Sequence, residues 1–404
     1  MISVQKAKDK IVASFSELPA EDISLDMAVG RVLAKPLVAR RTQPPCDLSS
    51  MDGYAVRCQD FSKLPLDLCC IGEAPAGTMF EGSVGPGETV RIFTGGPVPS
   101  GADAVVLQED TTANNECITV TEKPAPGQYI RRAGLDFAAG VDQILPGRFL
   151  KVRDIGLAAA MNHPWVSVRR RPIITILATG DEIVRPGEPL NQNQIVSSNS
   201  ICLKAFVENC GAIGINLGIA KDDTSTLDRM IGGAIGSDLL ITTGGISVGD
   251  YDLVRQTLLS KGLAVDFWKV AMRPGKPVMF GKLGRVPVLG LPGNPVSALV
   301  CSLIFVKPII EKLLGILAPD IEKSYATLTK ALPANDQRQD YLRAKLSSDQ
   351  KGALTVTPFP KQDSSMISLL ACSDCLIVRA PRAQEALEGE RVEILTFPKG
   401  TSAV

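Results

Sequence analysis

The middle of the chain alternates short apolar runs with segments of helical periodicity. Apolar, β-branched runs predict strands over residues 173–177, 214–219, 239–242 and 287–291. Apolar residues at helical spacing predict helices over 199–209, 224–235, 252–261 and 295–314. Strands that alternate with helices favour a doubly wound, mostly parallel sheet. We therefore predict a central α/β domain over residues 172–323, which binds its ligands at the C-terminal ends of the strands.

The flanking segments have different patterns. Residues 1–40 begin with a helical stretch and continue as extended chain, and together with residues 141–171 they predict a mixed α+β domain of elongated shape. Residues 41–140 are dense in proline and glycine, with short β-like runs between the turns, which predicts a β-rich inserted domain. Residues 324–404 again alternate apolar and polar positions and predict a C-terminal β-barrel or sandwich.

Composition narrows the class of protein. A chain of 404 residues is too long for one core. Lys and Arg together number 43, as do Asp and Glu, so no net charge attracts nucleic acid or an anionic membrane. The longest apolar stretch, 297–310, is interrupted by Lys307 and Pro308, and the N-terminus lacks the apolar core of a signal peptide. We expect a cytoplasmic protein with no nucleic-acid or membrane partner.

The cysteines and the histidine limit the chemistry. Ten cysteines lack the spacing of a zinc site, which predicts reduced thiols in a cytosolic protein. The single histidine, His163, cannot build a His-rich zinc site and lies in a loop-like stretch that does not favour a Ser-His-Asp triad. The chemistry must therefore rest on carboxylates, Lys and Arg, hydroxyls and backbone amides.

Acidic residues and glycines follow the predicted strands. Glu182 follows the first strand, Asp222 the second, and Gly244, Gly245 and Asp252 the third. Glycines let backbone N–H groups approach a bound anion closely. Because parallel strands end on one edge of a sheet, the three carboxylates are expected to converge, and a cation must then offset their repulsion. Mg²⁺ is the simplest such cation, since it prefers oxygen ligands and phosphate partners.

A purely structural interpretation of these loops stays open. Asp222 or Asp223 can cap the helix that begins at Thr224. Asn294 and Pro295 fit the N-cap and first position of a helix, a role that is compatible with an anion site.

Two further segments carry candidate chemistry. Lys269, Arg273 and Lys276 lie in a loop stiffened by proline and glycine, where they can neutralise a phosphate or oxyanion or simply be solvated surface charges. Residues 44–56 form a polar loop entered through two prolines, and this pattern fits either a site or a buried turn.

Seven segments, in order, resemble motifs of the molybdopterin molybdenumtransferase family, which includes MoeA and the gephyrin E domain. They are PPCDLSSMDGYAV at 44–56, IFTGGPVPSGADAVV at 92–106, RRAGLDFAAG at 131–140, ATGDEIV at 178–184, TTGGISVGDYD at 242–252, WKVAMRPGKPVMFG at 268–281 and LPGNPVSALV at 291–300. One such motif is weak support, whereas seven in the family's order make coincidence implausible.

The resemblance implies an activity and an assembly. The family inserts molybdate into adenylylated molybdopterin, hydrolysing the adenylate with Mg²⁺ and releasing AMP. It forms an elongated, four-domain homodimer, with its active cleft between the α/β domain of one subunit and the β-rich side of the other. The implied partners are the molybdopterin adenylyltransferase and the proteins that mature molybdoenzymes.

The resemblance also implies residue roles. Metal binding and catalytic charge fall on Glu182, Asp222 and Asp252, and further catalytic acids on Asp52 and Asp136. Substrate binding falls on Thr94, Gly244, Gly245, Ser247, Lys269, Arg273, Lys276, Pro292, Asn294 and Pro295. Asp52, Thr94 and Asp136 are expected to act across the dimer interface. Arg273 stands where other members can carry lysine, which keeps the charge but changes the geometry. Residues 364–366 are similar to a serine-rich family loop.

Three alternatives remain at this stage. A tungstate-handling transferase of the same fold would have the same sequence features, because the two anions are nearly equal in size and charge. A non-catalytic scaffold is the second alternative, since the gephyrin E domain also clusters receptors, although the three retained carboxylates argue against it. An unrelated nucleotide phosphohydrolase is the third, and the order of the motifs argues against it.

Overall fold

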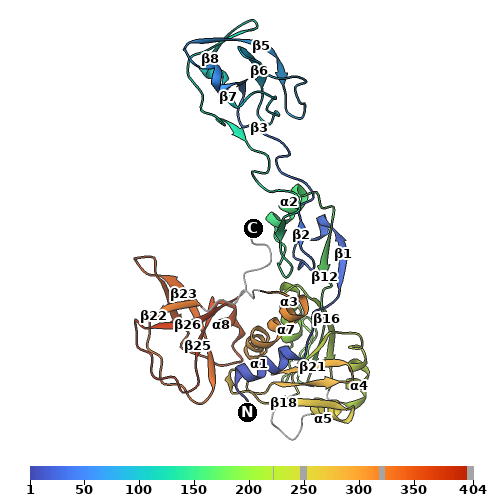
Figure 1. Cartoon of the computed structure of the whole chain (residues 1–404). Coiled ribbons are helices and arrows are strands. Elements are labelled where there is room, and N and C mark those ends of the chain that lie inside the picture. Colours follow the sequence, from blue (N-terminus) through green and yellow to red (C-terminus); the bar gives the residue numbers. More distant parts are fainter. Residues whose placement is uncertain (222, 246–252, 318–323, 398–404) are drawn as a thin grey trace.

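The chain folds into four regions arranged along an elongated body (Figure 1). The computed structural model describes residues 1–221, 223–245, 253–317 and 324–397. The β-rich domain lies at one end, a small mixed region follows it, and the α/β domain lies at the other end with the C-terminal barrel beside it (Figure 1). The predicted fold class is confirmed.

The α/β domain is built on a six-stranded sheet with the order β16-β13-β17-β21-β20-β18. Four neighbouring strands are parallel: β13 (Ile173–Thr179), β16 (Ile213–Ala220), β17 (Leu239–Thr243) and β21 (Val286–Leu291). Two antiparallel strands extend the sheet: β18 (Leu263–Trp268) and β20 (Met279–Leu283). The sequence did not indicate these two, because β18 mixes buried and exposed positions without a clean alternation.

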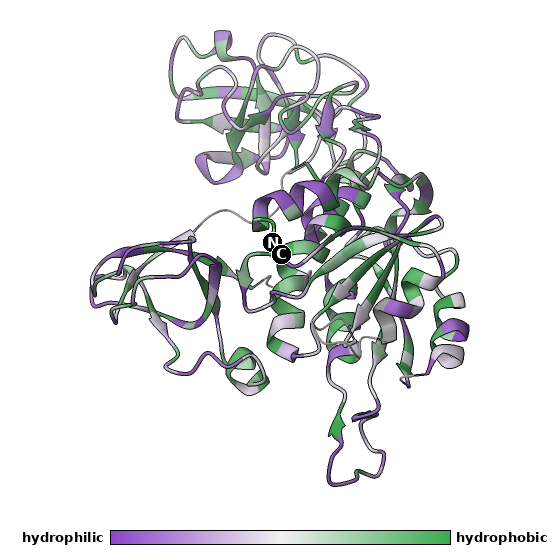
Figure 2. Cartoon of the chain, turned by 90° about the horizontal axis from the view of Figure 1, so that it is seen from below, coloured by the Kyte–Doolittle hydropathy of each residue, from purple (hydrophilic) through white to green (hydrophobic). Residues whose placement is uncertain are grey.

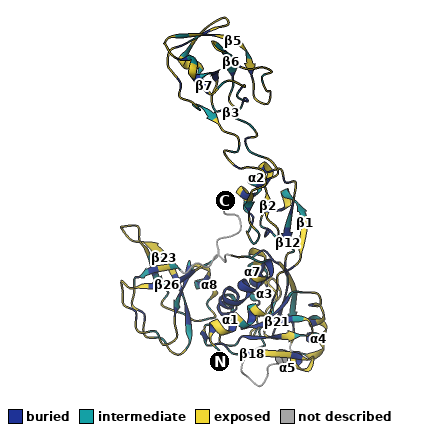
Figure 3. Cartoon of the chain, in the orientation of Figure 1, coloured by how far each residue is buried: buried dark blue, intermediate teal, exposed yellow. Residues whose placement is uncertain are grey.

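Helices cover both faces of this sheet, as the doubly wound pattern predicts. They are α3 (Asn199–Asn209), α4 (Thr224–Gly232), α5 (Leu253–Ser260), α6 (Pro295–Cys301) and α7 (Lys307–Leu314), the last two joined by a π-helical turn at Ser302–Val306. Neighbouring residues of β17 point to opposite faces: Leu239 and Ile241 pack into the cluster that holds α3, α6 and α7, and Leu240 into the one that holds α4 and α5. The inner strands β13, β17 and β21 are accordingly hydrophobic and buried (Figures 2 and 3).

The first helix, α1 (Val4–Ala13), belongs to the same core. Its buried residues Val4, Ala7 and Ile11 join the cluster under α7, and Ser3 caps its N-terminus by accepting from the Lys6 backbone N–H at 3.2 Å. This packing differs from the prediction that residues 1–40 belong to one domain. The reason is tertiary, because the apolar stripe of α1 gives no sign of the surface that it covers.

The mixed region is small and rests on short strand pairs. These are β1 (Ala20–Ser24) with β12 (Trp165–Arg169) and β2 (Leu37–Val38) with β11 (Asp142–Ile144), and helix α2 (Val152–Ala160) packs beside them. A further pair, β3 (Leu48–Ser49) with β10 (Ile130–Arg131), leads into the β-rich domain.

The β-rich domain holds one six-stranded sheet. Its order is β7-β4-β6-β5-β9-β8, with β4 (Gly53–Val56), β5 (Leu66–Ala74), β6 (Glu88–Ile92), β7 (Ala104–Leu107), β8 (Thr111–Asn114) and β9 (Cys117–Val120).

The C-terminal domain is a five-stranded barrel, closed where β23 pairs with β25. Its strands are β22 (Ser324–Leu328), β23 (Gln339–Ser348), β24 (Leu354–Pro358), β25 (Cys375–Arg379) and β26 (Arg391–Thr396), with helix α8 (Ile367–Ala371) beside them. The short strand β19 (Met272–Arg273), which comes from the α/β segment, pairs with β23 and ties the two domains together.

Candidate active site

The C-terminal ends of the parallel strands meet on one edge, as predicted. The register pairs Thr179 of β13 with Ala220 of β16, and Thr243 of β17 with Leu291 of β21. The loops that follow these four residues therefore start side by side. They carry most of the predicted ligand-binding residues of this domain.

Glycine is required at position 244, where these loops touch. Gly244 has a φ of +91°, and a Cβ there would collide with the carbonyl oxygen of Thr179. A Cβ on Gly293 would lie 3.6 Å from the Gly244 Cα. Beside them the Thr179 side chain is buried, and its hydroxyl has no hydrogen-bond partner among the residues that the structure describes. Close backbone approach together with an unsatisfied hydroxyl fits a polar ligand at this edge.

Asn199 holds two of the loops together, a role that sequence reasoning missed. The first residue of α3, it donates from Nδ2 to the Gly293 carbonyl at 2.7 Å and to Thr243 Oγ1 at 2.9 Å. Thr243 Oγ1 in turn donates to the Pro292 carbonyl at 3.2 Å. The run of serines and asparagines at residues 197–200 was the available signal, but it also fits an ordinary helix start.

The loop before α6 reaches the C-terminal domain. Asn294 occupies the N-cap and Pro295 follows it, as predicted, but the Asn294 side chain makes no capping bond. Its Nδ2 instead donates to Ser364 Oγ at 2.7 Å, and the Val296 N–H donates to the Ser364 carbonyl at 3.1 Å. The serine-rich segment suggested by the sequence thus lies beside the strand-end loops.

The part of the chain that the structure describes includes only one of the three predicted metal ligands. Glu182 is exposed on the loop after β13, and its carboxylate lies against Gly180. Asp222 and Asp252, with Ser247, lie outside the described residues, so the meeting of the three carboxylates stays a prediction. The helix cap falls on Asp223, which accepts from the Thr226 N–H and the Ser225 hydroxyl, each at 2.8 Å. These bonds lower the pKa of Asp223 to about 2.

The cationic loop connects β18 to β20 and contains β19. The Lys269 ammonium lies 4.3 Å from the centre of the Trp268 ring, a cation–π contact. Lys276 is exposed, and its carbonyl accepts from the Val270 and Val278 N–H groups at 3.0 and 3.2 Å.

Gly245 has a φ of 59° and stands at the end of the described part of the β17 loop.

Arg273 points into the C-terminal domain. Its Nε donates to Asp340 Oδ2 at 3.0 Å and its Nη2 to Asn335 Oδ1 at 3.2 Å, while Nη1 lies 3.4 Å from an Asp336 oxygen. Asp340 is buried, and the loss of solvent raises its pKa despite this arginine. Its second oxygen, Oδ1, has no hydrogen-bond partner among the described residues.

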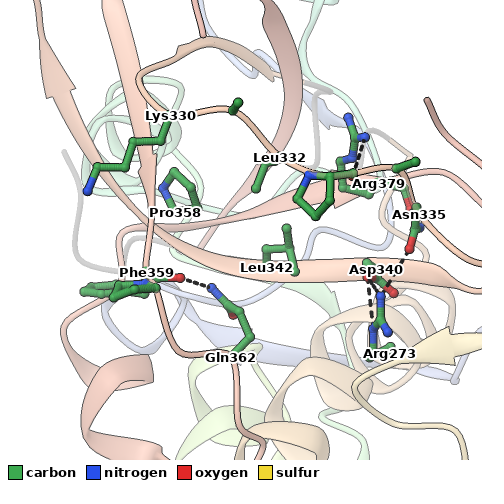
Figure 4. Close-up of a pocket in the computed structure, with 14 residues that line it drawn as sticks. Arg273, Lys330, Leu332, Asn335, Asp340, Leu342, Pro358, Phe359, Gln362 and Arg379 are labelled. Carbon is green, nitrogen blue, oxygen red and sulfur yellow. Dashed lines mark hydrogen bonds and ion pairs between the residues drawn. The ribbon is translucent and has the colours of Figure 1, made fainter. Parts of the chain in front are cut away.

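A cavity of about 380 Å³ opens beside this pair (Figure 4). Its lining combines the Arg273–Asp340 pair with apolar and polar side chains of the barrel, among them Lys330, Leu332, Phe359, Gln362 and Arg379.

The buried Arg343 donates to Oε1 of Gln362, a residue of the cavity lining, and to the carbonyls of Lys361 and Met366, which fixes the loop that carries Ser364. Desolvation lowers the pKa of Arg343. Neither Asp340 nor Arg343 was singled out from the sequence, because a charged residue inside a strand is usually solvated.

The remaining candidates lie elsewhere in the molecule. Thr94 follows β6 and donates from its N–H and its hydroxyl to one Asp52 oxygen, at 2.7 and 2.8 Å. These bonds lower the pKa of Asp52. Asp136 is exposed where the β-rich domain joins the mixed region, and its N–H donates to the Gln43 carbonyl at 3.0 Å. Within one chain, the β-rich domain is far from the strand-end edge (Figure 1).

Three family models match this chain in sequence order. They are described as "MoeA N-terminal region (domain I and II)" over residues 2–162, "Probable molybdopterin binding domain" over 175–312 and "MoeA C-terminal region (domain IV)" over 325–397. This chain belongs to the MoeA family. The molybdopterin molybdenumtransferase of Haemophilus influenzae is 34% identical over 98% of the chain and 99% of its own length. That of Nostoc sp. PCC 7120 is 41% identical over 74% of the chain and 71% of its own length.

Solved structures of MoeA proteins have the same fold over nearly the full length of this chain. A molybdopterin biosynthesis MoeA protein from Pyrococcus horikoshii superposes with a TM-score of 0.85 at 30% identity, covering 99% of this chain and 100% of the solved one. A second structure from the same organism gives 0.85 at 27% identity, over 98% of this chain. The structural similarity thus extends over all four regions.

Proposed function

We propose that this chain inserts molybdate into adenylylated molybdopterin, with Mg²⁺-dependent hydrolysis of the adenylate and release of AMP. The membership of the whole chain in the MoeA family places it in molybdenum cofactor biosynthesis as a molybdopterin molybdenumtransferase. The observation that carries the chemistry is the strand-end edge, where Gly244 and Gly293 meet beside the start of α6. Glycines that let a ligand approach the backbone closely suit a phosphate-linked substrate.

In our proposal, different residues around the strand-end edge bind different parts of the substrates. We assign the pterin phosphate or nucleotide to the loop of Gly244, Gly245 and Ser247, where the glycines permit close approach and the serine offers a hydroxyl. Pro292, Asn294 and Pro295 shape the opposite wall, which Asn199 holds in place. Lys269, Arg273 and Lys276 supply positive charge for the phosphates and for molybdate, which is a tetrahedral dianion.

Carboxylate oxygens are the donor type that Mg²⁺ prefers, and the loops of the strand-end edge carry them. Glu182 offers an exposed carboxylate beside the edge, and Asp222 comes two residues after Ala220, which pairs with Thr179. In the described part of the chain, no group of three or more His, Cys, Asp or Glu residues is placed to hold a metal. Our assignment of Glu182, Asp222 and Asp252 therefore rests on the strand order. A bound Mg²⁺ supplies charge neutralisation for the cleaved phosphoanhydride.

A homodimer would bring together the two groups of candidate residues. Asp52, Thr94 and Asp136 lie at or near the β-rich end, far from the strand-end edge of the same chain (Figure 1). In our proposal they act on the α/β domain of the second subunit. The Asp52 carboxylate, which two bonds from Thr94 keep ionised, then serves as a fixed negative charge in the shared cleft.

The substrate also indicates partners and a compartment. Adenylylated molybdopterin must come from an adenylyltransferase, and the product must pass to proteins that mature molybdoenzymes. All ten cysteines are free, which supports a reducing cytoplasmic environment. Within the described residues, no helix is both long and apolar enough to cross a membrane.

The direct test incubates the protein with adenylylated molybdopterin, Mg²⁺ and molybdate and follows AMP. We expect AMP release that depends on both molybdate and Mg²⁺. A folded dimer that releases no AMP would overturn the enzymatic proposal in favour of the scaffold. Competition between molybdate and tungstate in the same assay decides which anion the site prefers.

A further inference from the structure

Two exposed cysteines face each other on neighbouring strands of the β-rich domain. Strands β5 and β9 are antiparallel, and their register places Cys69 directly opposite Cys117. Both residues are exposed, and both thiols are free. β5 and β8, which flank β9 in the sheet, lie at the end of the molecule farthest from the α/β domain (Figure 1).

The backbone hydrogen bonds show which of the two kinds of antiparallel pair Cys69 and Cys117 form. The Cys70 N–H donates to the Glu116 carbonyl at 2.7 Å. The Cys69 N–H instead points away from β9 and donates to the Gly87 carbonyl at 2.9 Å. Hydrogen-bonded and non-hydrogen-bonded pairs alternate along an antiparallel ladder, so Cys69 and Cys117 form a non-hydrogen-bonded pair. The Cα atoms of such pairs are about 4.5 Å apart, within the range that a disulfide spans.

The next pair on the same face shows that side chains there do meet. Asp67 and Thr119 are also opposite each other, and Thr119 Oγ1 donates to Asp67 Oδ1 at 2.6 Å. Cys70 lies on the other face, where it packs against the core cluster with Leu68 and its thiol is 3.5 Å from the Gly72 carbonyl. It is adjacent to Cys69 in sequence but is turned away from Cys117.

We propose that Cys69 and Cys117 are an oxidisable dithiol that closes to a disulfide in the presence of a disulfide-class oxidant such as glutathione disulfide. One thiolate attacks the oxidant, forms a mixed disulfide and releases one glutathione thiolate. The second thiolate attacks the protein sulfur of that mixed disulfide and releases the other glutathione. The two protein thiols are oxidised, the oxidant is reduced to two thiols, and these take up the two protons.

The new bond would join β5 to β9 and enclose β6, β7 and β8. Closing a loop of this length restricts the unfolded chain, so the oxidised domain is expected to unfold at a higher temperature. The inference rests on the strand register and on the exposure of the two cysteines, and it does not depend on the proposed enzymatic activity.

The test uses the full-length, fully reduced protein in mixtures of oxidised and reduced glutathione. After acid quenching, alkylation and digestion, mass spectrometry identifies each linked or modified cysteine. We expect a peptide pair joined through Cys69 and Cys117, and a higher melting temperature for the oxidised protein. Cys69→Ser should instead accumulate glutathione on Cys117, whereas the matched control Cys70→Ser should form the same link as the wild type.

Cys372, an exposed thiol in the C-terminal domain, serves in the same sample as the reference for how readily an ordinary exposed thiol reacts with glutathione disulfide. Absence of the Cys69–Cys117 link when Cys372 already carries glutathione would overturn the proposal, and so would equal linkage of Cys70 to Cys117. If a variant fails to fold, the wild type in urea serves as the comparison. The preference for Cys69 over Cys70 should disappear there, and a preference that persists in urea would show that the register does not cause it.

Discussion

Arg273 ties the α/β domain to the barrel, and its removal should be costly. In the folded protein its guanidinium holds Asp340 and also contacts Asn335 and Asp336. The Asp340 side chain is only 5% exposed, and Oδ1 has no partner within the described structure. Replacing Arg273 with alanine therefore leaves a buried carboxylate without its cation.

The size of the effect follows from the burial of the two partners. Breaking a fully buried ion pair from one side costs about 3–5 kcal/mol. The Arg273 side chain is 46% exposed, so water screens part of the interaction. After this discount we expect Arg273→Ala to lower the free energy of unfolding by about 2 kcal/mol.

The loss should also depend on pH. Burial raises the pKa of Asp340 above its unfolded value, so the folded state retains the proton to a higher pH. Without Arg273 this pKa rises further. The stability deficit of Arg273→Ala should therefore be small at acidic pH and grow as the pH increases through the folded pKa.

Urea unfolding of the wild type, Arg273→Ala, Asp340→Asn and the double variant measures the coupling. Asp340→Asn alone should cost little, because Arg273 keeps its contacts with Asn335, Asp336 and water. The double variant should recover most of the loss, because no buried charge remains. A single Arg273→Ala variant within about 0.5 kcal/mol of the wild type, or a double variant that recovers nothing, would refute the reasoning.

The same variants separate the structural role of Arg273 from its predicted role in binding. If the arginine also binds molybdate, the stable double variant should still show a raised KM for molybdate, whereas Asp340→Asn should not. An unchanged KM in the double variant would leave Arg273 with the structural role alone.

The other predictions concern the strand-end edge. Gly244→Ala should lower stability by about 2 kcal/mol and abolish AMP release, because φ is +91° there and the methyl group meets the Thr179 carbonyl; normal unfolding and activity would contradict this. Asn199→Asp keeps the size but removes two donated bonds, so it should raise KM for the pterin substrate by roughly tenfold, and an unchanged KM would argue against its positioning role. Asp222→Ala should keep the fold and abolish molybdate-dependent AMP release, and full activity would remove the metal assignment. Asp223→Ala, its matched control, should remain active but lose helix stability. Because the folded pKa of Asp223 is about 2, the loss of stability measured by urea unfolding should be present above pH 3.8 and shrink as the pH falls towards 2. A loss that does not change with pH would contradict the role of the Asp223 carboxylate as a helix cap.

The α/β domain shows why part of this fold could be read from the sequence. Its inner parallel strands β13, β17 and β21 are largely apolar runs because both faces are covered, and such runs are visible without coordinates. The loops with Gly244 and Asn294 follow those runs directly, and parallel strands end on the same edge. Both the fold class and the position of the candidate edge therefore followed from local pattern and strand direction.

The tertiary structure decided which distant side chains meet. The Asn199 amide bonds to Thr243 and Gly293, and Asn294 turns from its helix cap to Ser364. Arg273 enters a buried pair with Asp340, 67 residues away in sequence. Hydrophobic periodicity encodes which face of an element is buried, but not which element covers it. Contacts between polar groups far apart in the chain depend on that packing, so the sequence determined the strand-end edge and the fold determined the side chains that support it.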